Sequence, residues 1–351
     1  MGVKFTSAKW YLDWDDDFTP EIAQGFSGQK VIPELTWQPQ INGGCILYQD
    51  VIAGKYDPYL NRFIQDIKRT GVNIRIALAP EMNGAWAAWA VGNCGNSTSD
   101  FVSFWRYVVD KFRQQSAPIA WIWSPNIRHW GETATFASIY PGDNYVDFLG
   151  VEGYNWGTTQ SWSEWQSFKQ VFLSSYNDLV AISPKNIIIT EFASAEQGGN
   201  KAQWILDMFT DLKSTFPRIS GITWFNMNKE TDWRINSSAA SEAAFREGAR
   251  KFFTTDNPIV GINQNPVSET SQSTIQKIDK STIAQNNETK VENPSEQAND
   301  TDTNSESSNT TNKDSNASPN RSNDSSQALF FIIWIGSIML LLPITIWLAV
   351  K

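Results

Sequence analysis

The chain has 351 residues, a formal net charge of −9, 17 Trp and 20 Phe, but only one His and two Cys. One His and two Cys cannot supply a typical zinc site, and we expect neither a metal nor a cofactor. The acidic balance argues against a nucleic-acid-binding protein, which would normally carry a basic patch, and fits a neutral, hydroxyl-rich ligand such as a polysaccharide.

Short apolar runs alternate with helical patterns over the first 256 residues. One helix has clear boundaries: Asp57 can cap it, Pro58 suits its first turn and Gly71 ends it. Further helices are predicted over about 99–115, from 163 onward, around 204–212 and near 241–253. Seven strands are predicted, at 9–14, 31–37, 74–78, 119–123, 148–151, 186–190 and 221–225.

This alternation favours an α/β fold, a (β/α)8 TIM barrel. A doubly wound sheet is the alternative, but no Gly-x-Gly-x-x-Gly and no phosphate loop supports it. A barrel of this class has eight strands, and seven are predicted. The missing strand should precede Lys9, where only eight residues remain, so we expect the first strand to be absent or shortened.

Three zones divide the chain. Residues 1–256 are predicted to form a globular domain. Residues 257–327, rich in Ser, Thr and Asn, are predicted to form a disordered linker, because they cannot bury enough apolar surface to fold. Residues 328–350 hold no charge over 23 positions, long enough for a helix to cross about 30 Å of hydrocarbon. We therefore predict a transmembrane helix there, with a buried soluble helix as the alternative.

The charges at the two ends of the chain bear on its location. Lys351 directly follows the apolar run and favours the cytoplasmic side, so we expect a single-pass protein of the cell membrane whose globular domain lies outside the cytoplasm. Residues 1–17 lack the apolar core of a signal peptide. Either the tail directs insertion, or Met1 is not the true start.

Two glutamates follow predicted strands at the ends where TIM barrels carry their active sites. Glu81 follows the strand at 74–78, and Glu191 directly follows the strand at 186–190. Two such carboxyls are what glycoside hydrolysis needs, with a solvated loop charge as the alternative for each. Tryptophans near the strand ends could stack on sugar rings, with core packing as the alternative for each: Trp86, Trp89, Trp156 and Trp224.

Five segments, in the family order, together resemble glycoside hydrolase family 26, and the resemblance extends over about residues 9–253. The segments are "PEMNGAWAAW", "WIWSPN", "YPGDNYVDFLGVEGYNWG", "IIITEFASAEQGGNKAQWI" and "FPRISGITWFNMNKETDWRI". That family includes β-mannanases, with some β-1,3-xylanases and mixed-linkage β-glucanases. The resemblance implies a (β/α)8 barrel and a retaining mechanism, and it makes the seven predicted strands numbers two to eight.

The resemblance also assigns roles to residues. Glu81 matches the acid/base and Glu191 the nucleophile, while Tyr154 matches a tyrosine beside the nucleophile and Trp224 the aromatic floor under the sugar at the cleavage point. Further candidates for substrate binding lie in the matched motifs or directly after strands: Trp86, Trp89, Asn83, Trp156 and Asn126.

One departure leaves the substrate open. The family usually has His before the acid/base, and this chain has Pro80, which offers no side-chain hydrogen-bond donor. We therefore predict a retaining endo-β-glycanase acting on mannan-like or related β-linked polysaccharide. The alternative is a catalytically weak barrel that binds glycan at the cell surface.

The two cysteines lie in loops that follow consecutive predicted strands, on the same face of the expected barrel. Cys45 and Cys94 could form a disulfide in an exported chain, with two free buried thiols as the alternative.

Overall fold

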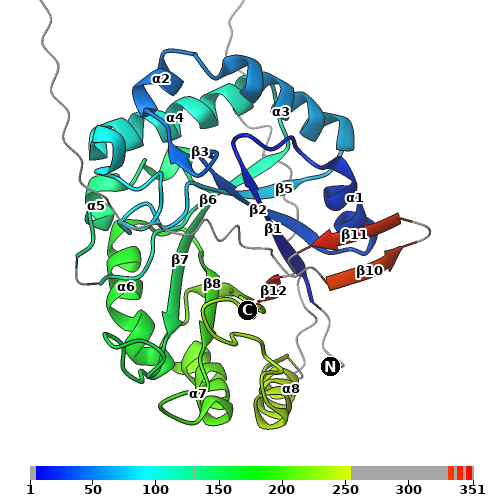
Figure 1. The fold of residues 1–351 in the computed structure, drawn as a ribbon, viewed down its shortest axis with the longest axis vertical. Helices are drawn as coiled ribbons and strands as arrows, with labels where there is room; N and C mark the ends of the chain where they lie inside the picture. The colour runs from blue at the N-terminus through cyan, green and yellow to red at the C-terminus, as the bar shows by residue number, and fades with distance from the viewer. Residues whose placement is uncertain (1–4, 130, 254–330, 336–337, 343–344, 350–351) are drawn as a thin grey trace, which may run out of the picture. The chain divides into compact units, whose positions relative to one another are not determined.

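The fold comes from a computed structural model, which describes residues 5–129, 131–253, 331–335, 338–342 and 345–349 (Figure 1). For the last three of these ranges, only the backbone is described. The linker predicted over 257–327 lies outside the described residues and stays a prediction.

Seven parallel strands form most of a barrel, in the order in which the sequence predicts them (Figure 1). Each consecutive pair is hydrogen-bonded in parallel register. The strands are β1 (Ser7–Asp13), β2 (Ile32–Gln38), β5 (Ile74–Leu78), β6 (Ile119–Trp123), β7 (Phe148–Asn155), β8 (Ile187–Ser194) and β9 (Ile219–Trp224). Their carboxyl ends therefore meet at one face of the barrel, as the (β/α)8 prediction requires.

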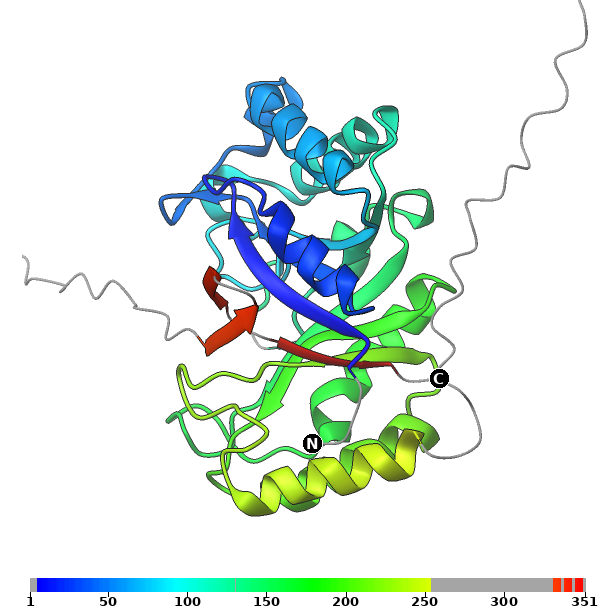
Figure 2. The ribbon, with the colours of Figure 1, turned by 90° about the vertical axis from the view of Figure 1, so that its right-hand side faces the viewer.

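The barrel is closed by a strand from the opposite end of the chain. β12 (Thr345–Ala349) lies antiparallel between β1 and β9, and Figure 2 shows it next to the beginning of β1. The place of the strand expected before Lys9 is thus taken by a C-terminal segment.

Within the segment predicted as a transmembrane helix, 328–350, the described ranges are strands. β10 (Phe331–Ile335) and β11 (Ile338–Leu342) form an antiparallel pair, and β12 follows. In the described ranges, no helix has the length and apolar character needed to cross a membrane. An apolar run does not by itself distinguish helix from strand, and here Gly336 and Pro343 divide the run into pieces of strand length in the sequence.

Helices alternate with the strands and pack outside them (Figure 1). The predicted bounds are confirmed in α3 (Asp57–Thr70), and Gly71 ends the helix in the left-handed conformation. The prediction that Asp57 caps it is wrong: Tyr56 is the N-cap residue, no side chain caps the helix, and Asp57 is its first residue. The other helices are α1 (Pro20–Gly28), α2 (Tyr48–Ile52), α4 (Thr98–Gln114), α5 (Phe136–Ile139), α6 (Phe168–Ile182), α7 (Lys201–Ser214) and α8 (Ala239–Phe253). Short elements complete the set: β3 (Gln40–Ile41), β4 (Gly44–Cys45), η1 (Asn93–Gly95) and η2 (Asp143–Tyr145).

One helix starts later than predicted. The sequence pattern begins at about residue 163, whereas α6 begins at Phe168 because Ser167 and Gln170 form a reciprocal capping box at its start. Ser97 and Asp100 cap α4 in the same way.

Most of the tryptophans belong to the core rather than to a binding surface. The Trp37 ring stacks on Phe63 with centroids 4.4 Å apart, which joins β2 to α3. Among the described residues, ten Trp side chains are buried, each with 6% or less of its surface exposed: Trp10, Trp14, Trp37, Trp89, Trp105, Trp121, Trp123, Trp204, Trp224 and Trp233. High Trp content in this chain therefore reflects packing between the strands and the helices, since each ring buries a large apolar area.

Candidate active site

Glu81 stands on a tight turn just beyond the end of β5. Ala79 and Glu81 both adopt the left-handed backbone conformation, with φ of 46° and 53°. This conformation is costly for residues with a Cβ, so the surrounding structure has to hold it in place. Part of that support is a hydrogen bond from the Glu81 amide to the Ser124 carbonyl at the end of β6, 2.8 Å long.

The Glu81 carboxyl accepts hydrogen bonds from two neutral donors. Trp86 Nε1 donates to one oxygen at 3.1 Å, and Asn126 Nδ2 donates to the other. Burial and the nearby negative charge of Glu191 raise the pKa of Glu81 to about 7, against the opposing effect of the two donors. Glu81 is thus a carboxyl that holds its proton up to neutral pH, as a general acid must.

Glu191 lies within β8, in extended backbone beside Glu152 of β7. Tyr11 of β1 donates its phenol proton to Oε2 at 2.5 Å, and Tyr154 of β7 donates to Oε1. Burial and the neighbouring Glu191 charge raise the pKa of Tyr154 well above its usual value, so this phenol stays a donor. Both oxygens of Glu191 are therefore held in fixed directions by side chains from two other strands.

A buried cation lies beneath Glu191. Lys9 of β1 donates to the Thr190 carbonyl at 2.6 Å, and its ammonium lies 3.4 Å from the Glu34 carboxylate; both side chains are fully buried. Burial alone would lower the pKa of Lys9, but the carboxylates of Glu34, Glu152 and Glu191 outweigh it and raise that pKa. Lys9 therefore places a permanent positive charge under β8.

Aromatic rings flank both glutamates. On the Glu81 side, Trp86 is 59% exposed and its ring lies 5.1 Å from the His129 ring. On the Glu191 side, Trp156 is half-buried, with its ring 5.3 Å from that of Trp162, which is 69% exposed. Exposed indole faces of this kind suit stacking on sugar rings.

The structure does not give Trp224 the role that the resemblance implies. Its side chain is 1% exposed and packs against Trp204 of α7 and Phe245 of α8, so it points outward from the barrel to the helices. Trp233, in the loop after β9, lies closer to the site, with its ring 5.0 Å from Tyr154 and 4.9 Å from Trp156. Nothing in the sequence distinguished Trp233 from other core tryptophans.

Two further candidates turn out to support the loops rather than face a ligand. Trp89 is 6% exposed and donates from its indole nitrogen to the Pro80 carbonyl at 2.6 Å. Asn83 is fully buried and pairs with Asn126 through bonds of 3.0 and 2.8 Å. Asn126 both supports the loop and contributes to the site, because its backbone binds Asn83 and its side chain donates to Glu81.

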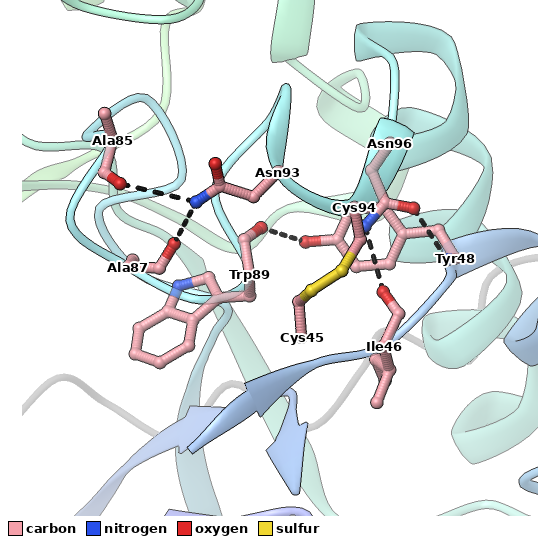
Figure 3. The surroundings of a disulfide bond; sticks show 9 residues. All are labelled: Cys45, Ile46, Tyr48, Ala85, Ala87, Trp89, Asn93, Cys94 and Asn96. Atoms are coloured by element: carbon pink, nitrogen blue, oxygen red, sulfur yellow. Dashed lines mark hydrogen bonds between the residues drawn. A yellow bond between two sulfur atoms is a disulfide. The ribbon is translucent and has the colours of Figure 1, made fainter. Parts of the chain in front are cut away.

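The predicted disulfide is present. Cys45 of β4 and Cys94 of η1 are bonded, with Cα atoms 6.3 Å apart (Figure 3). Next to it, Asn93 donates to the carbonyls of Ala85 and Ala87 at 3.3 and 2.7 Å, on either side of Trp86. The disulfide thus restrains the long loop after β5, which carries Trp86 next to Glu81.

Tyr11 is a site residue that the sequence analysis missed. It lies in the middle of a strand with a mixed apolar and polar pattern, which gives no sign that its hydroxyl reaches a residue 180 positions away. As for metals, no group of three or more His, Cys, Asp or Glu side chains in the described part of the chain is arranged to hold an ion.

Comparison with known proteins adds a family and several relatives. The model of "Glycosyl hydrolase family 26" matches residues 48–231. "Endoglucanase H" of Acetivibrio thermocellus is 40% identical over 253 residues, which is 70% of this chain and 28% of the relative. A "Mannan endo-1,4-beta-mannosidase" of Bacillus subtilis is 22% identical over 189 residues, which is 51% of this chain and 45% of the relative.

A solved structure, a double mutant of the Cellulomonas fimi endo-beta-1,4-mannanase, shares the fold. Its TM-score is 0.50 at 19% identity, covering 66% of this chain and 56% of the other. This chain spans less than half the length of each of the two curated relatives named above.

Proposed function

The chain belongs to glycosyl hydrolase family 26, and we propose that it is a retaining endo-β-glycanase with Glu81 as acid/base and Glu191 as nucleophile. The observation that carries the proposal is the difference between the two carboxyls. Burial and the Glu191 charge raise the pKa of Glu81 to about 7, whereas both oxygens of Glu191 accept hydrogen bonds from tyrosine hydroxyls. Two carboxyls with such different surroundings are suited to the separate roles of acid and nucleophile.

In the first step, the Glu191 carboxylate attacks the anomeric carbon while Glu81 gives its proton to the leaving glycosidic oxygen. The product is a glycosyl ester on Glu191, which no longer carries a negative charge. Because that charge is one cause of the raised pKa of Glu81, its loss favours release of the next proton. In the second step, Glu81 takes a proton from water, which then cleaves the ester.

For the substrate, we propose a β-linked glucan, with mannan as the second choice. The relative that is 40% identical is named as an endoglucanase, and the relative named as a mannosidase is 22% identical. Pro80 supports placing glucan before mannan, because the family usually has His at this position and proline offers no side-chain donor in its place. The Pro80 carbonyl is itself occupied by the Trp89 indole.

A panel of polysaccharides tests the proposal. Mixed-linkage β-glucan, mannan and β-1,3-xylan are each incubated with the wild type and with Glu191→Ala, and new reducing ends are measured. We expect release from at least one glycan by the wild type and none by the variant. Binding of a glycan by the wild type without any cleavage would instead favour the alternative, a glycan-binding barrel.

We also propose that residues 328–350 anchor the protein in the cell membrane with the catalytic domain outside the cytoplasm. The absence of charge over these residues supports this. A membrane-spanning helix over these residues excludes the strand β12, so the anchored protein would lack the strand that lies between β1 and β9. Alkaline extraction of membranes from cells that express the full chain decides between the two: retention in the pellet supports the anchor, and release into the supernatant contradicts it.

A further inference from the structure

Three buried oxygens meet beneath the two catalytic glutamates. Glu152 of β7 places Oε1 3.1 Å from the Ser124 hydroxyl, just after β6, and 3.1 Å from the Thr190 hydroxyl of β8. The two hydroxyls also form a hydrogen bond with each other. Ser124 and Thr190 are fully buried and Glu152 is 2% exposed, so water does not compete for these contacts.

The three hydrogen bonds among these oxygens form a closed ring, and each of the three needs a proton between its two atoms. The hydroxyls of Ser124 and Thr190 supply one each, and an ionised carboxylate supplies none. With an ionised Glu152, one of the three oxygen–oxygen contacts would have no proton between its atoms, which is unfavourable in a buried site. Thr190 Oγ1 also lies 3.3 Å from the Val151 carbonyl, which adds to the demand for donors. A protonated Glu152 provides the third proton.

We propose that Glu152 is a positioning residue that keeps its own proton while the enzyme works, and that its ring of hydrogen bonds with Ser124 and Thr190 holds both catalytic glutamates in place. This inference rests on the proposed function. The ring reaches Glu81 through the Ser124 carbonyl, which accepts the Glu81 amide at 2.8 Å. It reaches Glu191 through Thr190, the preceding residue.

The charges around Glu152 agree with this assignment. Burial, then the negative charges of Glu191 and Glu81, raise the pKa of Glu152 well above its usual value. Lys9 acts in the opposite direction, but its charge is shared with Glu34, 3.4 Å away, and with Glu191. A neutral Glu152 leaves Glu191 as the one carboxylate that must be ionised next to the acid Glu81.

Variants of the full chain test the role of Glu152. Glu152→Ala removes the ring, and we expect kcat to fall by about 100-fold with KM little changed, since small displacements of catalytic groups cost this much. Glu152→Gln has an amide that can donate in place of the acid, and we expect it to recover most of the lost kcat. Because the proposed neutral acid is replaced by a neutral amide, the basic limb of the pH profile of kcat/KM should stay in place.

Two outcomes would overturn the proposal. In Glu152→Gln, a shift of the basic limb to lower pH by about half a unit or more would mean that Glu152 carries a negative charge that acts on Glu81. Wild-type kcat in Glu152→Ala would mean that the ring does not position the site. Should the alanine variant fail to fold, the glutamine variant and the spectroscopic measurement below still decide.

Infrared spectroscopy reads the protonation state without any catalysis. Above the pH at which Glu81 ionises, the wild type should keep the C=O stretch of a buried protonated carboxyl, and Glu152→Gln should lose it. Glu196→Gln is the matched control, because Glu196 also accepts from two serine hydroxyls, of Ser237 and Ser241, at 2.7 and 2.8 Å, but has a lowered pKa. This control should keep the band. Absence of the band in the wild type contradicts the proposal, whereas a chain that shows the band but cleaves no glycan contradicts only the proposed function.

Discussion

The two sides of the site hold the same kind of side chain in opposite ways. Glu191 sits inside a strand, and its oxygens are fixed by phenols from β1 and β7. Glu81 sits on a left-handed turn and accepts from one indole and one amide. The regular barrel therefore orients Glu191 directly, whereas Glu81 depends on a loop that other contacts must hold in place. Two side chains of one type thus acquire different chemical properties from their surroundings.

The largest expected effect separates the two glutamates. Glu191→Ala and Glu81→Ala should each lower glycan hydrolysis by roughly ten-thousand-fold, because each removes a reacting group. On an aryl glycoside, whose leaving group needs no proton, Glu81→Ala should retain far more of its first step than Glu191→Ala. Added azide should restore turnover in Glu191→Ala, with a product of inverted configuration, measured by NMR. Equal losses on both substrates in the two variants would contradict the division of roles.

The next effect concerns the nucleophile side alone. Tyr11→Phe and Tyr154→Phe each remove one hydrogen bond to the Glu191 carboxylate, and a bond to a charged group contributes about 1.5–3 kcal/mol. We expect kcat to fall by roughly 10- to 100-fold in each variant, measured by steady-state kinetics. Tyr107→Phe is a suitable control, because its hydroxyl contacts Asp57 away from the site. Unchanged kcat in either site variant would show that its phenol does not assist Glu191.

The pH profile tests the acid side. Because Glu81 acts as an acid only when protonated, kcat/KM should fall about tenfold per pH unit above a pKa of about 7. In Glu191→Gln, loss of the neighbouring charge should lower the pKa of Glu81, which NMR titration can follow. A basic limb far above pH 7 in the wild type, or an unchanged Glu81 titration in the variant, would contradict the coupling.

The same pKa shift affects stability with a defined sign. The folded chain binds the Glu81 proton more tightly than the unfolded chain, whose value lies near 4.5. This group therefore stabilises the fold at low pH, and its contribution to the free energy of unfolding decreases as the pH rises from about 4.5 through about 7.

The smallest expected effect on activity comes from the disulfide. It closes a loop with a sequence separation of 49 residues, so removing it should lower the free energy of unfolding by up to about 4 kcal/mol. We expect the Cys45→Ser/Cys94→Ser variant to unfold at a lower temperature in calorimetry and to lose activity only a few-fold, through a looser Glu81 loop. The wild type under reducing conditions should match the variant. An unchanged unfolding temperature would show that the disulfide does not stabilise the fold.

The sequence by itself determined the order of the seven parallel strands, the position of both glutamates and the main helix boundaries. These features depend on local patterns: apolar runs of strand length, helix-boundary residues such as Pro58 and Gly71, and polar residues directly after a strand. The two cysteines were also predictable as a pair, because consecutive parallel strands bring their following loops to one face.

Only the tertiary structure decided which face of each strand a side chain occupies and what it meets there. Alternation along β9 leaves either face possible for Trp224, and register shifts between β8 and β9 break the simple pattern. The contacts of Tyr11 with Glu191 and of Glu152 with Ser124 and Thr190 join strands that are distant in the chain. The apolar tail had the same ambiguity on a larger scale, because hydrophobicity favours burial but does not choose between a helix and strands; pairing with β1 and β9 made that choice for β12.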